Sequence, residues 1–161
     1  MKIEQINAKV QSYLAAKDLI KKKQETWQNK IRDLIFDLLK NLSLNSDLPA
    51  RAELNDAVEN HNSVILVLND EVTNFRDHFT GKRFIKKGGS LIFAQLKNGN
   101  IMTVIKKPEL PELGSDYENL IIGKEYPPES LNSNVVLDIV GDFIDKMIEW
   151  ENSQDRGQIG F

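Results

Sequence analysis

The sequence predicts an α+β fold: a long N-terminal helix, an antiparallel meander of about three to five strands, and a C-terminal amphipathic helix packed on the first. Three observations support this. No glycine precedes Gly81, and no proline lies between Lys2 and Leu42, where apolar residues follow a heptad. Short β-branched runs fill the middle of the chain, and helical spacing of apolar residues returns after Asn134. A chain of 161 residues has the length of a single domain, here 1–161.

The first predicted helix covers residues 1–42. Its a and d positions are apolar except for Lys17 and Gln24. A helix of about 40 residues is about 60 Å long, which exceeds one face of an 18.4 kDa globule. Part of the stripe is therefore expected to bind another surface, and the lysine run 21–23 is the expected place for a bend. The predicted partner-binding residues are Ile3, Ile6, Val10, Tyr13, Ile20 and Trp27.

Trp27 has two interpretations, and Trp150 in the last helix shares them. Tryptophan is enriched among the residues that dominate binding energy at interfaces. A large aromatic side chain in an amphipathic stripe also fills a core. The sequence leaves both interpretations open.

The segment after the first helix is predicted as a short helix over 47–61, because Ser46 or Asp47 can cap it and Pro49 suits its first turn. A strand over 52–59 is the competing interpretation. The sheet is then expected over 63–122. The apolar run 64–68 is typical of a central strand buried on both faces.

A hairpin is the strongest local prediction. Residues 91–96 and 101–105 are apolar runs joined by Asn98-Gly99, which favours a primed two-residue turn. Residues 72–79 are predicted as an edge strand or a loop, and 120–122 as a last strand.

The C-terminal helix is predicted over 134–151, where apolar residues recur three and four apart. Five acids oppose Lys146 in this stretch, whereas residues 1–42 carry nine basic and five acidic residues. Opposite charge beside two apolar stripes predicts that the terminal helices pack on one another. The last helix is too short to cover the first, so homodimerisation is the simplest way to cover the remainder. A parallel pair of first helices is disfavoured, because lysines recur at its g positions with few acids at e.

Composition bounds the function. The absence of cysteine excludes disulfides, thiol catalysis and thiolate metal sites. A net charge of −3 does not favour nucleic acid or an anionic membrane as partner of the whole molecule. The N-terminus lacks the apolar core of a signal peptide, and no 18-residue apolar run occurs. We expect a cytoplasmic protein without a cofactor, a metal or a membrane span.

The basic stretch 79–89 is the most distinctive candidate for binding chemistry. Its cations and two glycines suit phosphate, because backbone N–H groups can face an anion there. The alternative is a solvated loop whose lysines protect a strand edge. The candidate anion-binding residues are Lys82, Arg83, Lys86 and Lys87.

Catalytic patterns are sparse. Asp77 followed by Gln95-x-Lys97 resembles the acid and [E/Q]-x-K signature of restriction-type nucleases, which would imply a metal-dependent phosphodiesterase. The alternation of a half-buried strand explains the same residues. His61 and His78 are the only histidines, and no nucleophile motif accompanies them.

The sequence therefore favours a non-enzymatic protein-interaction module, such as an adaptor, chaperone-like factor or regulatory subunit, that acts through its first helix. The alternative is a nucleic-acid-associated protein or phosphodiesterase built on the basic loop. No catalytic residue is assigned.

Overall fold

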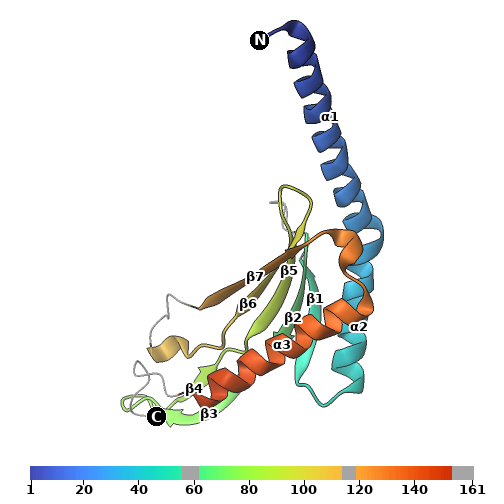
Figure 1. Cartoon of the computed structure of the whole chain (residues 1–161). Helices are drawn as coiled ribbons and strands as arrows, with labels where there is room; N and C mark the ends of the chain where they lie inside the picture. Colours follow the sequence, from blue (N-terminus) through green and yellow to red (C-terminus); the bar gives the residue numbers. More distant parts are fainter. Residues whose placement is uncertain (56–61, 114–118, 154–161) are drawn as a thin grey trace.

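The computed structural model describes residues 1–55, 62–113 and 119–153. It confirms the α+β fold class: a 43-residue N-terminal helix, an antiparallel five-stranded sheet and a C-terminal helix. Figure 1 shows the N-terminal half of the first helix projecting from a two-layer body. The sheet forms one layer of that body, and the remaining helical segments lie against it.

The N-terminal helix runs without interruption from α1 (Ile3–Thr26) through one π-helical turn, η1 (Trp27–Ile31), into α2 (Arg32–Asn45). The departure from α geometry thus falls at η1, and the lysine run 21–23, where the sequence predicts a bend, is regular α-helix.

The π-turn also changes which residues face the core. The heptad predicts burial at Leu34 and Leu38, but the fully buried residues of α2 are Ile35 and Leu39. A π-turn holds more residues per turn than an α-turn. It therefore rotates the following side chains, and the buried stripe moves by one residue.

The main sheet is antiparallel throughout, with strand order β1-β2-β5-β6-β7. Strands β3 and β4 form a separate two-stranded hairpin between β2 and β5 in the chain. The strands are β1 (Ala50–Asn55), β2 (Ser63–Leu68), β3 (Glu71–Arg76), β4 (Arg83–Lys86), β5 (Ser90–Gln95), β6 (Ile101–Lys106) and β7 (Leu120–Tyr126).

The short helix predicted over 47–61 is wrong, because residues 50–55 form strand β1, paired with β2. Ala50, Ala52 and Leu54 share one face of this strand, and Arg51 and Glu53 share the other. That period of two suits a sheet with one covered face. The competing strand interpretation is confirmed for residues 52–55, and residues 56–61 lie outside the described part of the chain.

The predicted hairpin is confirmed as β5 and β6, but its turn differs. The N–H of Gly99 donates to the carbonyl of Leu96 (2.9 Å), so Lys97 and Asn98 are the central residues of the turn. Gly99 follows with φ +87°. This is a three-residue hairpin loop with glycine in the left-handed position, rather than a two-residue primed turn.

Helix α3 (Ser133–Asn152) crosses the sheet on the same face as α2 (Figure 1). The side chain of Asn132 caps it by accepting a hydrogen bond from the N–H of Val135 (3.0 Å). Contact between α3 and the N-terminal helix is weak. The predicted packing of the two terminal helices is thus limited to a weak contact of α2 with α3, and the buried side chains of both helices join one core with those of the sheet.

The core lies between this sheet face and η1, α2 and α3. It combines Trp27, Ile35 and Leu39 with large side chains of the central strands and of α3. The central members from the sheet and α3 are Val64, Leu66, Leu91, Phe93, Ile101, Val136, Val140, Phe143 and Met147.

The opposite face of the sheet is also apolar, but its residues are only partly buried. By the strand register, Ile65, Ile92 and Val104 lie side by side there, and the edge strand adds the exposed Ile122. The strand predicted over 64–68 is thus buried on the face that α2 and α3 cover, and only partly buried on the other face.

Candidate functional site

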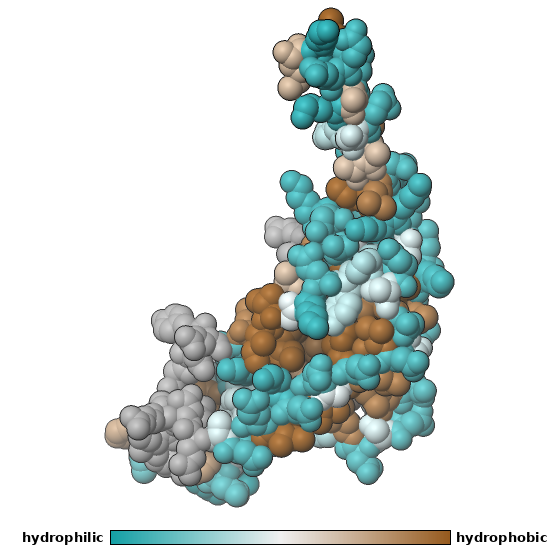
Figure 2. Space-filling model, viewed as in Figure 1, coloured by the Kyte–Doolittle hydropathy of each residue, from teal (hydrophilic) through white to brown (hydrophobic). Residues whose placement is uncertain are grey.

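The projecting part of α1 is the most unusual surface of the molecule. Every residue from Met1 to Leu19 is exposed, and α1 contributes no buried residue. We call residues 3–19 the arm; at 1.5 Å per residue it is about 25 Å long. Ile3 is 75% and Tyr13 62% exposed, and Ile6 and Val10 are exposed beside them. Figure 2 shows that hydrophilic residues predominate on the visible side of the arm.

The arm ends where the helix meets the β5–β6 turn. Nζ of Lys23 donates to Oδ1 of Asn100 (2.9 Å). A Cβ placed on Gly99 would lie 2.6 Å from Cβ of Lys23 and 3.2 Å from the carbonyl oxygen of Ile20, so only glycine allows this close approach. We call this contact the clasp. Ile20 is half-buried at it and belongs to the boundary of the arm.

Trp27 lies further along the same stripe and is fully buried. Its side chain is a central member of the core cluster. Of the two interpretations of Trp27, the core position is the one that the structure shows, and Trp27 is not part of the exposed apolar surface of the helix. Trp150, in contrast, is half-buried near the end of α3.

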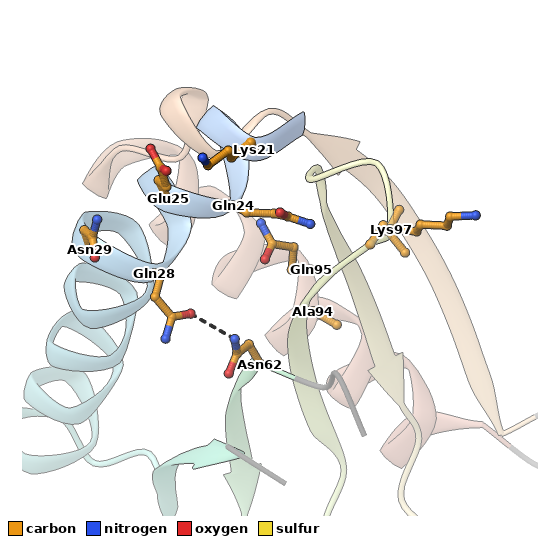
Figure 3. A pocket seen from close by; sticks show the side chains of 10 residues that line it. Lys21, Gln24, Glu25, Gln28, Asn29, Asn62, Ala94, Gln95 and Lys97 are labelled. Atoms are coloured by element: carbon orange, nitrogen blue, oxygen red, sulfur yellow. Dashed lines mark hydrogen bonds between the residues drawn. The ribbon is translucent and has the colours of Figure 1, made fainter. Parts of the chain in front are cut away.

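A groove lined mainly by residues with polar or charged side chains, which we call the polar groove, lies at the foot of the arm between the helix and the end of β5 (Figure 3). Its volume is about 1010 Å³. Gln28 and Asn62 approach each other across it, and Nδ2 of Asn62 donates to Oε1 of Gln28 (2.9 Å). The lining residues are Lys21, Gln24, Glu25, Gln28, Asn29, Asn62, Ala94, Gln95, Leu96 and Lys97.

Carboxamides dominate this groove, and they donate and accept hydrogen bonds without exchanging protons near neutral pH. Such a lining suits binding more than acid–base chemistry. Gln24, one of the two polar breaks in the heptad, is among its residues. The stripe on the first helix therefore passes from the exposed arm, through the clasp and the groove, into the core.

The basic stretch predicted to bind anions has a different arrangement. Nζ of Lys86 pairs with Glu71 (3.1 Å) and with Glu151, and it lies 5.5 Å from the centroid of the Trp150 ring. Its side chain is only 13% exposed. Burial opposes a raised pKa of Lys86, but the hydrogen bonds to Glu151 and Glu71 outweigh it and raise the pKa. Lys86 thus joins the β3–β4 hairpin to the end of α3.

Lys87 and Gly88 are engaged with the chain's own carboxylate, that of Asp70. Nζ of Lys87 pairs with Asp70 (3.0 Å), and the N–H of Gly88 donates to the same carboxylate (3.1 Å). These two contacts, the Lys87 bond first, lower the pKa of Asp70. A Cβ on Gly88 would lie 2.0 Å from the carbonyl oxygen of Leu68. The glycine allows close strand approach, and Asp70 takes the place of an external anion.

Lys82 and Arg83 are exposed at the far end of the same hairpin, where the structure shows no ion pair for either among the described residues. The four predicted cations are therefore not one cluster: two are neutralised by carboxylates, and two face solvent.

The nuclease-like pattern is dispersed by the topology. Asp77 lies in the β3–β4 loop, where its carboxylate accepts hydrogen bonds from the N–H groups of Phe79 and Thr80 (2.7 and 2.8 Å). Gln95 is the last residue of β5, next to the β5–β6 turn, and its amide donates to the carbonyl of Gly99 (3.1 Å). His78 is exposed in the loop beside Asp77, and His61 lies outside the described residues.

Comparison of the chain with protein-family models, with curated proteins and with solved structures finds no match. Within the described residues, no group of three or more His, Asp or Glu side chains is arranged to hold a metal ion. In the same residues, no helix combines the length and the apolar character needed to cross a lipid bilayer.

Leu14 and Leu19 are exposed apolar residues of the arm that the heptad does not identify. They occupy positions outside a and d, so a count of heptad positions omits them. Leu14 lies four residues after Val10 and extends the apolar surface around the helix.

Proposed function

We propose that this chain is a non-enzymatic protein-interaction module, such as an adaptor, chaperone-like factor or regulatory subunit, and that its arm binds the partner. One observation carries the proposal: an apolar stripe lies on a helix that leaves the body of the protein and has none of its own residues buried. An amphipathic helix that inserts its apolar face into a groove is a recurrent mode of protein recognition.

Apolar burial supplies the binding free energy in this proposal. Fully burying a side chain such as Ile or Val stabilises by about 1.5–3 kcal/mol, and the arm offers Ile3, Ile6, Val10 and Tyr13. Association costs roughly 4–15 kcal/mol in lost freedom. The expected complex is of moderate affinity, and the polar groove at the foot of the arm can add hydrogen bonds to it.

The basic loop gives less support to the alternative, a nucleic-acid-associated protein or phosphodiesterase. Asp70, Glu71 and Glu151 neutralise Lys86 and Lys87. The remaining pair, Lys82 and Arg83, offers too little charge for the strong counterion release that drives nucleic-acid binding.

The test is a charge placed on the apolar side of the arm. The variant Val10→Asp/Tyr13→Asp should lose the partners that the wild-type protein retains in affinity capture. The matched control is Gln11→Asp/Ala15→Asp, which adds the same charge on the other side of the arm. Both variants should unfold in urea like the wild type, because none of the four residues is buried. Retention of every partner by the first variant would refute the proposal.

A further inference from the structure

The outer surface of α3 carries two parallel stripes. One is apolar: Leu137 (44% exposed), Gly141, the half-buried Ile144 and Ile148 (52% exposed). The other is acidic and shifted by one residue along the helix. It consists of Asp138, Asp142, Asp145 and Glu149, all exposed. Both follow a spacing of four, three and four residues, so each forms a continuous row along the helix.

A crevice opens beside the apolar stripe of α3. Its volume is about 250 Å³, enough to receive a large side chain. Ile144 and Ile148 form one wall, Leu48 and Leu68 belong to the segments on its other side, and Glu151, which pairs with Lys86, also lines it. In Figure 2, a hydrophilic band crosses the body over the region of α3, with hydrophobic surface next to it. Gly141 leaves open space above the helix, which lets a second helix approach closely.

The arm has the complementary properties. Lys9 lies beside its apolar residues, Lys17 lies within the stripe, Lys2 directly precedes the arm, and the 21–23 lysine run follows it. Basic residues beside one apolar stripe suit acidic residues beside another. Within one chain this match is not made, because the arm projects away from the body (Figure 1) and helix–helix contact is weak.

We propose that the arm of one copy docks on the outer surface of α3 of a second copy, and that the reverse contact forms at the same time. The inference rests on the proposed role of the arm and names its partner. A two-fold dimer of this kind makes each contact twice and leaves no unpaired copy of either surface. Pairing between two arms is less favourable, because parallel arms bring the g-position residues Lys2 and Lys9 beside e positions that hold no acid.

A charge swap tests the proposal. Variant one carries Lys9→Glu/Lys17→Glu on the arm, and variant two carries Asp142→Lys/Asp145→Lys on α3. Each alone places like charges at both contacts, which should raise the dissociation constant of the dimer by about tenfold or more. In a mixed dimer from an equimolar mixture, the altered arm meets the altered α3 with opposite charge at one contact, and the other contact is wild type, so both contacts are complementary. Light scattering coupled to size exclusion should therefore show a dimer for the wild type, a shift to monomer for each variant alone, and recovery of the dimer in the mixture.

The control variant Lys82→Glu/Arg83→Glu changes the net charge by the same amount as variant one, but on the exposed β3–β4 hairpin, and it should remain a dimer. A second measurement uses the lack of cysteine in the chain. Copies with Val10→Cys mixed with copies with Ile144→Cys should form a mixed disulfide on oxidation, and copies with Gln11→Cys should not.

A wild-type monomer at micromolar concentration would overturn this inference, as would variants that still dimerise alone or a mixture that stays fully monomeric. Each result leaves the proposed function separately testable, because loss of another protein partner in Val10→Asp/Tyr13→Asp does not depend on self-association.

Discussion

Lys23 and Asn100 are 77 residues apart in the sequence, and a hydrogen bond of 2.9 Å from Nζ to Oδ1 joins them. The contact fixes the helix against the turn between two central strands. On one side of it, the helix continues into the core through Trp27; on the other, every residue up to Leu19 is exposed. The clasp therefore defines where the body ends and the arm begins.

Replacing Gly99 by alanine should weaken the clasp. Gly99 has φ +87°, and the new Cβ would meet Cβ of Lys23 at 2.6 Å. Gly81→Ala is a matched control, because Gly81 has φ +71° and a Cβ added there would meet nothing within 4 Å. Both variants should lose about 1 kcal/mol in the free energy of unfolding, because alanine is strained in the left-handed backbone conformation. Gly99→Ala should lose roughly a further 1–2 kcal/mol from crowding. Equal losses in urea unfolding would show that the clasp does not constrain the fold.

Amide hydrogen exchange should divide the first helix at the clasp. An exposed helical segment of about 17 residues is only marginally stable in water, so amides in the arm should exchange fast. From Ile20 onward, contact with the body should slow exchange. When a partner is bound to the arm, the amides of the arm should be protected from exchange. Uniform protection along α1 of an isolated monomer would contradict the arm boundary.

Lys86 should matter for stability, whereas Lys87 should not. Replacing Lys86 by methionine leaves Glu71 and Glu151 without their shared cation, at a position that is 13% exposed. Because both glutamates are more than half exposed, we expect a loss of about 1 kcal/mol in the free energy of unfolding. The control Lys87→Met removes an exposed pair with Asp70 and should change stability little. Similar losses in both variants would refute the anchoring role of Lys86.

The carboxylates of Asp70 and Asp77 should contribute to acid sensitivity. Both have a pKa below the usual 3.8: Asp70 mainly through Lys87, and Asp77 mainly through the N–H of Thr80. A lowered pKa in the folded state gives stability that is present above pH 3.8 and is lost as pH falls through the folded values. Asp70→Asn/Asp77→Asn should thus be less stable than wild type near neutral pH, and the difference should shrink in acid. A difference independent of pH would contradict this.

Trp27 and Tyr13 lie on the same heptad stripe but should respond differently to truncation. Trp27→Ala removes a fully buried side chain, which should cost about 3–5 kcal/mol of stability. Tyr13→Ala changes a residue that is 62% exposed and should leave unfolding nearly unchanged. Chemical denaturation of the isolated protein measures both, and a large loss from Tyr13→Ala would show that the arm folds onto its own body.

The long helix, the β5–β6 hairpin and α3 could be predicted because each carries a local signal that packing reinforces. The segment 47–61 could not, since Ala50 and Leu54 suit either period and the pairing partner β2 decides between them. The one-residue shift of burial to Ile35 and Leu39 follows from a π-turn that no residue pattern in the sequence marks.

The candidate site was predictable in part. Exposure of Ile3, Ile6, Val10 and Tyr13 follows from the length of the helix compared with the size of the body. The sequence could not predict that Lys86 is paired while Lys82 and Arg83 face solvent. The pairing of Lys86 with Glu151 depends on where the end of α3 meets the hairpin. Charge balance indicated that the terminal helices suit one another, but it could not show that the arm leaves its own body.

The clasp also determines how the molecule responds to mechanical load. We expect a pull on the tip of the arm to load the Lys23–Asn100 contact, where the helix meets the body. The tension passes into β5 and β6, which lie in the interior of the sheet and are each hydrogen-bonded on both sides. Interior strands resist peeling better than a free edge, so traction on the arm is borne by the sturdiest part of the body.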